Sequence, residues 1–413
     1  MTYKAKNILS SIQKISNGYL DKIADPKIVF LGKTWNSYQF WVYSGVITGT
    51  LVVLIIAFVK HISLPIISGV MVIVAILSFF LFKITKIFGE NYPILNWAKK
   101  GVYHFQIVAL GFTLGFLTIV NAPILVNLDI LVIGMLLYQA FGRIGCLTTG
   151  CCHGRPSRWG ICYGDKYSET GYIYFINKIR FFPVQFIECI WLFFLAIVSV
   201  LTVLNFHLPG DNVSRYVIGY GILRFFLEFM RGDPKRVYFS GFSEAQWTAL
   251  SLSIIVICLE IRGILPLQFW HSIPVIIMSL TLIALLLRKH YHRPTIHQLR
   301  HPDHILEIFQ TIGWLNSQHI NLSTEGAFLP KTLVTGTTSL GIQITLCGFP
   351  DKSNMSLLYR LSLVAGRLRI KSAKTISKLI ILLKYNTAQY KIIENDNGNF
   401  DLLINFLPYF KEL

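Results

Sequence analysis

The sequence predicts an all-α polytopic membrane protein with seven or eight transmembrane helices, followed by a small soluble α+β domain. Only 14% of the 413 residues are charged, well below the roughly one quarter usual in soluble domains. The runs from Phe40 to Val59 and from Ser63 to Phe82 contain no charged residue. Each is about as long as a helix needs to cross a bilayer, roughly 20 residues at 1.5 Å rise. A buried helix of a soluble protein seldom reaches that length without a charge.

Apolar runs of this kind recur along the chain as far as residue 287. The predicted spans are 40–59, 63–82, 102–120, 124–142, 184–206, 216–230, 247–261 and 264–287. Only Arg262 and Gly263 separate the last two. The final run is therefore either a further crossing or a re-entrant or interfacial segment, and the count is seven or eight.

The chain divides into three parts by composition. Residues 1–39 form a polar N-terminal segment, residues 40–290 the membrane domain, and residues 295–413 a soluble α+β domain. In this tail the patterns predict an amphipathic helix at 304–315, strands at 333–346, a helix at 357–383 and a strand–turn–strand unit at 390–404. The tail carries no catalytic constellation.

A glycine-rich basic stretch begins where the fourth predicted span ends. From Gly142 to Gly164 it reads GRIGCLTTGCCHGRPSRWGICYG, which opens a predicted loop over 143–182. Glycine lets backbone approach a ligand closely, and the guanidinium groups of Arg143, Arg155 and Arg158 can bind phosphate oxygens in a two-point fork. The pattern predicts a phosphate-binding loop at the membrane surface. The alternative is a loop whose arginines contact headgroups without specificity, in keeping with the net charge of +18.

Charged and polar residues inside two spans point to the same site. Arg224, Glu228 and Arg231 are spaced by four and three, which places them on one face of a helix. Gln185 and Glu188 are also three apart. Charges inside spans are costly and usually face a functional cavity, although a purely structural pair of Arg224 with Glu228 is the competing interpretation.

Three motifs in this order resemble the prolipoprotein diacylglyceryl transferase family. They are GRIG…G…GRP…WG, then PVQFIE, then GYGILRFFLEFMRGDP, and the resemblance covers about residues 36–260. Members of that family are multi-span enzymes of the bacterial cytoplasmic (inner) membrane. They move diacylglycerol from phosphatidylglycerol to the cysteine thiol of lipoprotein precursors. The resemblance implies this location, these two substrates and membrane lipids as partners, with no cofactor and no nucleic acid.

The resemblance also implies site residues. The implied catalytic residues are Arg143, Arg231, His104, Arg224 and Glu228. The implied substrate-binding residues are Tyr38, Gly154, Arg155, Gln185, Glu188 and Tyr220.

The chain departs from the family pattern at three places. The family's H-G-G-L-I-G motif is absent, and the sequence around His104 reads YHFQIVALG. Cys146 replaces the asparagine usual three residues after the loop arginine, and Phe182 replaces the histidine usual before Pro183. These departures bear on substrate identity more than on fold.

The implied reaction is thiol alkylation, in which a cysteine thiolate attacks a glycerol carbon and glycerol phosphate leaves. Arg143 and Arg231, supported by Arg224, would stabilise the charge that builds on the leaving phosphate. A base must favour the thiolate, because the thiol is a poor nucleophile. His104 is the candidate base, and its alternative is an interfacial histidine with no proton role. Glu228 is expected to orient an arginine.

The cysteines of the loop leave two further interpretations open. Cys146, Cys151, Cys152, His153 and Cys162 contain enough soft ligands for zinc or an iron–sulfur centre. Their spacing lacks a C-x2-C knuckle, so no metal site is assigned, and a disulfide of Cys146 with Cys151 or Cys162 is the alternative in an oxidising compartment. A third class is a lipid-binding protein without catalysis.

The orientation of the loop in the membrane stays open. The family resemblance places it on the outer side. The segments 1–39, 83–101, 143–182 and 231–246 carry most of the Lys and Arg between spans, and the positive-inside rule places them in the cytoplasm.

Overall fold

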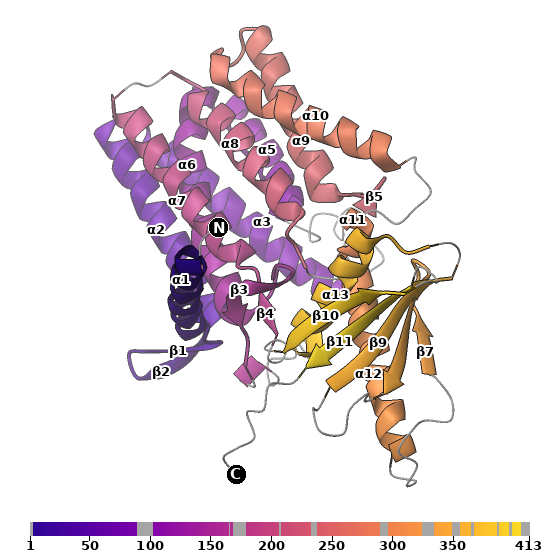
Figure 1. Cartoon of the computed structure of the whole chain (residues 1–413). Helices are drawn as coiled ribbons and strands as arrows, with labels where there is room; N and C mark the ends of the chain where they lie inside the picture. The colour runs from indigo at the N-terminus through magenta and orange to yellow at the C-terminus, as the bar shows by residue number, and fades with distance from the viewer. Residues whose placement is uncertain are drawn as a thin grey trace.

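The computed structural model is a helical bundle with a small sheet beside one end (Figure 1). It describes residues 3–88, 102–164, 166–167, 179–205, 208–232, 238–289, 296–323, 334–348, 356–364, 367–385, 388–395 and 399–405. The helices of the bundle are α2 (Ser37–Val59), α3 (Leu64–Phe88), α5 (Val102–Ile119), α6 (Ile124–Thr149), α7 (Val184–Asn205), α8 (Asp211–Glu228), α9 (Glu244–Ile261) and α10 (Ser272–Lys289). Every predicted apolar run therefore contains a helix.

Five helices of the described residues are long and apolar enough to cross a membrane. They lie at Ser37–Val59, Ile124–Thr149, Val184–Asn205, Glu244–Ile261 and Phe269–Leu287. In α3 and α5 the side chains that the structure describes are those of Leu64–Leu77 and Phe105–Ile119, which form apolar stretches, and α8 carries four charged residues. The protein is thus mostly helical with several candidate spans, while the count of seven or eight stays a prediction.

Glycines allow α2 and α6 to approach closely. A Cβ atom at Gly49 would lie 2.8 Å from the carbonyl oxygen of Gly134, and one at Gly45 would lie 2.8 Å from the Cβ of Phe141. Small residues spaced by four are typical of tightly packed membrane helices. The contact continues to the end of α6, where a Cβ at Gly145 would lie 3.1 Å from the ring of Tyr38.

Helix α6 is longer than predicted, and the predicted start of the loop at Arg143 is wrong. The helix continues to Thr149 and ends at Gly150, whose φ of 77° is left-handed, a common helix end that favours glycine. The hydroxyls of Thr148 and Thr149 donate to the carbonyl of Gly145 within this last turn. Arg143 and Cys146 are therefore held on a rigid helix.

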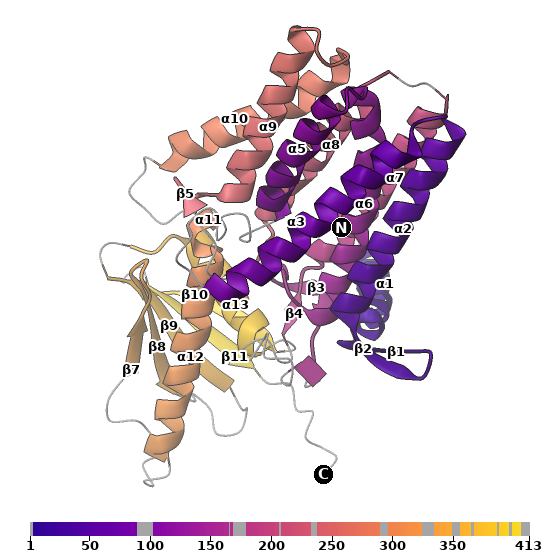
Figure 2. The same cartoon turned by 180° about the vertical axis from the view of Figure 1, so that it is seen from behind.

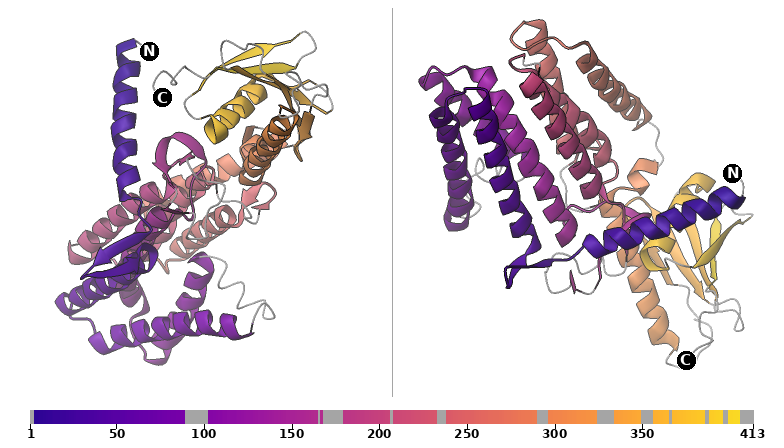
Figure 3. Two further views of the ribbon diagram at one scale, coloured as in Figure 1. Left: turned by 90° about the horizontal axis from the view of Figure 1, so that it is seen from below. Right: turned by 90° about the vertical axis from the view of Figure 1, so that its left-hand side faces the viewer.

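The polar N-terminal segment is structured. Helix α1 (Tyr3–Ile23) is followed by a hairpin of β1 (Lys27–Phe30) and β2 (Lys33–Asn36). After α6 the chain forms β3 (Pro156–Cys162), which pairs with β4 (Arg180–Phe181), and after α8 it forms β5 (Tyr238–Phe239) and β6 (Phe242–Ser243). Helix α1 lies beside β3 at this end of the bundle (Figure 3). We call this the loop end.

The tail folds into one antiparallel sheet with helices on one face (Figure 2). Its elements are α11 (Ile296–Leu299), α12 (Pro302–Ser323), β7 (Val334–Thr337), β8 (Ile342–Gly348), β9 (Ser356–Leu363), α13 (Ile370–Lys384), β10 (Gln389–Glu394) and β11 (Phe400–Asn405), with strand order β10-β11-β9-β8-β7. The strands predicted at 333–346 and 390–404 are confirmed. The helix predicted over 357–383 is wrong in its first third, because Leu357, Tyr359 and Leu361 alternate inward along β9.

The core of the tail is continuous with the loop end. Buried apolar residues from three parts of the chain form one cluster. The first part is the end of α1 and the residue that follows it, the second is the end of α6 with the segment around β3 and β4, and the third is the tail. Members are Leu20 and Ala24; Leu147, Ile161, Tyr163, Tyr167, Ile179 and Phe181; and, among those of the tail, Ile305, Ile312, Ile344, Leu361, Ile376 and Leu402. The N-terminal helix and the tail thus cover the side of the loop that faces away from the bundle.

Candidate active site

Three helices bring Arg143, Glu188 and Tyr220 together. Arg143 Nη2 lies 2.8 Å from Glu188 Oε1, and the hydroxyl of Tyr220 donates to the same carboxylate oxygen at 2.6 Å. All three side chains are buried, Glu188 completely. A buried charge is costly unless it is paired, so α6, α7 and α8 are held in register by this contact.

The charged residues predicted on α8 lie in the same region. Arg224 Nη2 and Glu228 Oε2 are 3.1 Å apart in a buried ion pair. Arg224 Nη1 is also buried and has no hydrogen-bond partner among the residues that the structure describes. An unsatisfied buried guanidinium nitrogen costs free energy, so this donor is available to an anion.

Arg231 lies outside the helices, and main-chain hydrogen bonds hold it in place. It follows α8 and forms a β-bridge with Gly154, while the amide of Arg155 donates to the carbonyl of Met230 at 2.9 Å and that of Gly232 to His153 at 3.0 Å. A Cβ at Gly154 would lie 2.2 Å from the carbonyl oxygen of Phe182. Only glycine permits this approach, which explains the role of Gly154 as a structural residue of the site.

The described part of the site is rich in guanidinium groups. The buried residues Arg143, Arg224 and Arg231 lie near two buried carboxylates, Glu188 and Glu228, and the charges of all three arginines act on Glu188. We call these five residues the arginine cluster.

Arg155 adds a further guanidinium at the edge of the cluster. It is half-buried, and its Nε donates to the carbonyl of Arg231 at 3.1 Å. Burial lowers the pKa of Arg155 to about 10, and the charge of Glu228 offsets only part of this effect. An anionic ligand beside Arg155 would favour its charged form.

Gln185 supports the loop from α7. Its Nε2 donates to the carbonyl of Cys151 at 2.7 Å and approaches the hydroxyl of Tyr163 at 3.5 Å. In this structure Gln185 therefore orients the chain after α6, while its predicted contact with substrate stays a prediction.

Two of the predicted site residues are not placed in the arginine cluster by the structure. Tyr38 begins α2, is half-exposed and packs against Gly145. The backbone of His104 belongs to α5, but its side chain lies outside the described residues, so its predicted role as a base is untested.

The sequence analysis missed a row of hydrogen-bonded polar side chains that continues from the arginine cluster along α6 and α8. Gln139 Nε2 donates to the hydroxyl of Tyr216 at 2.6 Å, and that hydroxyl lies 3.2 Å from Gln106 Oε1. The rings of Tyr216 and Tyr220 stack at 5.7 Å. The available signal was the spacing of four that links Gln139 to Arg143 and Tyr216 to Tyr220.

Three of the four cysteines in this region lie close together, and the fourth, Cys162, lies apart from them. The sulfur atoms of Cys146, Cys151 and Cys152 lie within 4.8 Å of one another, and among the described residues neither His153 nor Cys162 joins them. Of the five residues considered as possible metal ligands, the structure thus brings three together. The disulfide alternatives are not formed, because each of these four cysteines is a free thiol.

The Cys152 thiol is the most acidic of this group. The thiols of Cys146 and Cys151 donate hydrogen bonds to its sulfur, and together with the nearby charges of Arg231 and Arg143 they hold the pKa of Cys152 well below its ordinary value. The group of three thiols is therefore next to the arginine cluster.

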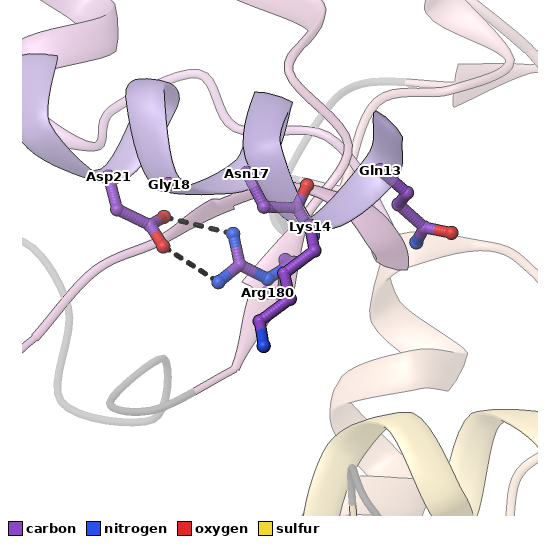
Figure 4. A pocket seen from close by; sticks show the side chains of 6 residues that line it. All are labelled: Gln13, Lys14, Asn17, Gly18, Asp21 and Arg180. Atoms are coloured by element: carbon purple, nitrogen blue, oxygen red, sulfur yellow. Dashed lines mark hydrogen bonds and ion pairs between the residues drawn. The ribbon is translucent and has the colours of Figure 1, made fainter. Parts of the chain in front are cut away.

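A separate shallow pocket lies on the outer side of the loop (Figure 4). There the carboxylate of Asp21 on α1 binds both guanidinium NH₂ groups of Arg180, at 2.9 and 2.7 Å. It also accepts from the amide of Cys162 at 2.8 Å, and Asn17 accepts from that of Gly160 at 2.9 Å. No residue of the arginine cluster lines this pocket, so we assign it to holding α1 on the loop.

Comparison with known proteins agrees with this geometry. A family model described as prolipoprotein diacylglyceryl transferase matches residues 34–262, more than half of the chain. A phosphatidylglycerol–prolipoprotein diacylglyceryl transferase of Clostridium tetani is 36% identical over 115 residues, which cover 28% of this chain and 45% of the relative. A second, from Clostridium perfringens, is 36% identical over 110 residues, or 26% and 40% of the two chains. One from Dehalococcoides mccartyi (strain CBDB1) is 29% identical over 136 residues, or 32% and 50%.

These alignments span half or less of the curated relatives. The family model, in contrast, takes in α2 to α9 and every residue of the arginine cluster. The chain belongs to the prolipoprotein diacylglyceryl transferase family.

Proposed function

We propose that this protein transfers the diacylglyceryl group of phosphatidylglycerol to the cysteine thiol of a lipoprotein precursor. The observation that carries the proposal is the buried arginine cluster, in which Arg224 Nη1 has no hydrogen-bond partner among the residues that the structure describes. A phosphodiester headgroup supplies a negative charge and several acceptor oxygens, which guanidinium groups bind well.

The proposed step forms one bond and breaks one. The sulfur of the acceptor thiolate attacks the glyceryl carbon that carries the phosphate, and the carbon–oxygen bond to phosphate breaks. The electron pair stays on the leaving oxygen, so that glycerol phosphate departs as an anion and the peptide retains a thioether. Fixed guanidinium groups stabilise the charge that develops on this oxygen.

The residues of the cluster have distinct roles in the proposal. Arg143 and Arg231 bind the phosphate, Arg224 supports them, and Glu188 and Glu228 hold arginine side chains in place. His104 is the proposed base that takes the proton of the thiol. Tyr38, Arg155, Gln185 and Tyr220 shape the lipid and headgroup site.

We also propose that the chain crosses the bacterial cytoplasmic membrane eight times. Helix α1, the β3–β4 loop and the tail share one apolar core, so they lie on one side. The number of crossings between α1 and the loop must then be even, as must the number between the loop and the tail. Helices α2, α3, α5 and α6 supply four, and α7 to α10 supply another four.

The function is tested by incubating the purified full-length protein with phosphatidylglycerol labelled in its headgroup and a precursor peptide that contains one cysteine. We expect release of labelled glycerol phosphate and a mass gain of one diacylglyceryl group on the peptide. A peptide with serine in place of cysteine is the control. Release without modification of the cysteine peptide, or no reaction with this lipid, would contradict the proposal.

The topology is tested with single cysteines labelled from outside intact cells. Arg158→Cys in β3 and Lys371→Cys in α13 are at exposed positions of the loop end, and we expect them to react alike with an impermeant reagent. Leu208→Cys, exposed between α7 and α8, is the matched control and should behave oppositely. Opposite reactivity of the first two positions would exclude eight crossings.

A further inference from the structure

The thiols of Cys146, Cys151 and Cys152 form a compact group that the proposed mechanism does not use. Their sulfur atoms lie within 4.8 Å of one another. In a tetrahedral zinc site the sulfurs are about 3.8 Å apart, given a Zn–S distance of about 2.3 Å. Shifts of about 1 Å or less in flexible side chains would therefore complete three bonds to one ion.

The backbone is shaped to bring the three thiols together. Cys146 lies on the last turn of α6, Gly150 ends that helix with φ 77°, and Cys152 has φ 57°. A left-handed conformation is uncommon and strained for a residue other than glycine. Here it reverses the chain so that the thiol of Cys152 returns to that of Cys146.

Neighbouring groups hold the cysteines by hydrogen bonds, as is usual for the ligands of a metal ion. The hydroxyl of Thr149 donates to the sulfur of Cys151 at 3.6 Å. The side chain of Gln185 holds the carbonyl of the same residue at 2.7 Å. Cys146 is a buried residue, whereas Cys151 and Cys152 are half-buried.

Among the described residues no other His, Cys, Asp or Glu joins the group. Three protein ligands with a fourth position for water or substrate are typical of catalytic zinc, whereas structural zinc has four protein ligands. One Zn²⁺ with three thiolates has a net charge of −1. The guanidinium groups of Arg143 and Arg231 lie close enough for their charges to act on Cys152, which lowers the electrostatic cost of an anionic site.

We propose that Cys146, Cys151 and Cys152 bind Zn²⁺ and that the fourth position receives the acceptor thiol as a thiolate. This inference rests on the proposed function and names how its nucleophile is activated. Binding of the ion releases three protons from the cysteines, and binding of the acceptor releases one more. After transfer the acceptor sulfur is a neutral thioether, which binds zinc more weakly than a thiolate and leaves.

The test begins with metal binding, which requires no turnover. Full-length protein is purified under reducing conditions, equilibrated with Zn²⁺, freed of excess ion and analysed for metal by mass spectrometry. We expect about one zinc per chain, lost in Cys151→Ser and in Cys152→Ser. Cys162→Ser, a loop thiol outside the group, is the matched control and should retain the ion. The two variants lie at half-buried positions, and a thermal unfolding curve verifies that they fold.

Replacement of zinc by Co²⁺ then reports on the fourth position. We expect thiolate-to-cobalt absorption from the protein alone, and a change in the visible cobalt bands on addition of the cysteine peptide but not of the serine peptide. Absence of zinc, equal zinc in Cys152→Ser and Cys162→Ser, retention of copper instead, or a disulfide within the group would overturn the inference.

Two outcomes distinguish this inference from the proposed function. Full transfer by metal-free protein would overturn the zinc site and leave the function standing. Zinc binding with peptide-sensitive cobalt bands, but without transfer from phosphatidylglycerol, would support the site and overturn the choice of lipid substrate.

Discussion

The two ends of α8 carry similar charged pairs that are satisfied in different ways. At the far end, Arg215 donates to Asp211, Asn212 and Thr202 at 2.5, 3.0 and 2.7 Å. The carboxylate of Asp129 accepts from the amides of Gly210 and Val213 at 2.6 and 3.0 Å, and so caps the helix. At the loop end, Arg224 contacts Glu228, and its Nη1 has no hydrogen-bond partner among the described residues.

The difference separates a structural ion pair from a binding site. A pair that stabilises a fold uses most of its donors within the protein, as Arg215 does. A site that binds an anion keeps a donor unused, as Arg224 Nη1 is among the described residues. The ion pairs at the two ends have similar burial and the same kinds of charged group. They differ in how many donors of the arginine have a hydrogen-bond partner, and this difference distinguishes the structural pair from the candidate binding site.

The largest contrast is expected from removing one arginine at each end. Arg143→Ala should lower turnover by about 100- to 1000-fold, since it removes a donor to the developing phosphate charge. Arg215→Ala should leave turnover within about threefold and lower the free energy of unfolding by about 1–3 kcal/mol. Turnover and thermal unfolding in detergent measure both effects.

The Arg143→Ala variant leaves Glu188 buried without its ion pair, so its folding needs a control. The double variant Arg143→Ala with Glu188→Gln removes both charges and should recover stability but not activity. Recovery of activity in the double variant would show that Arg143 serves only to neutralise Glu188.

A second comparison, between two substitutions of Arg231, tests whether the planar guanidinium group is needed in addition to the positive charge. Arg231→Lys retains the charge but loses the two-point fork, so it should bind phosphatidylglycerol nearly normally and turn over about tenfold slower. Arg231→Ala should lose both binding and turnover. Equal and full activity in the two variants would remove Arg231 from the phosphate site.

A smaller effect is expected at Glu228. Glu228→Gln retains an acceptor for Arg224 and should reduce turnover by only a few fold, roughly 1 kcal/mol in the barrier. The measurement is kcat beside lipid affinity. A loss as large as that of Arg143→Ala would instead assign Glu228 a direct part in the chemistry.

The smallest effect on activity is expected at the far end of α8. Asp129→Ala removes the cap of the helix and should cost about 0.5–2 kcal/mol of stability, with turnover unchanged once the protein is folded. Loss of turnover in folded Asp129→Ala would show that the two ends are coupled along α8.

The sequence predicts the membrane helices and the arginine cluster well, for a physical reason. Apolar runs and helical spacing are local signals, so the common face of Arg224 and Glu228 can be deduced without knowing any neighbour. The family motifs assign Arg143 and Glu188 to one site, whereas the ion pair between them is known only from the structure.

What could not be predicted depends on contacts between distant segments. Nothing local indicates that Asp21 binds Arg180, or that α6 continues past Arg143 to Thr149. The pattern of β9 fits a helix or a strand, and pairing with β8 and β11 decides the outcome. The proximity of three thiols depends on a left-handed Cys152, which composition does not reveal.

The apolar core at the loop end has a consequence for biosynthesis. It joins Leu20, near the start of the chain, to Phe181 in the middle and Leu402 near the end. A ribosome supplies these segments in order, so Tyr163 and Phe181 have no tail to cover them until the last strand has emerged. Maturation of the site therefore waits for completion of the chain, and a nascent or shortened protein would present this aromatic surface to chaperones and proteases.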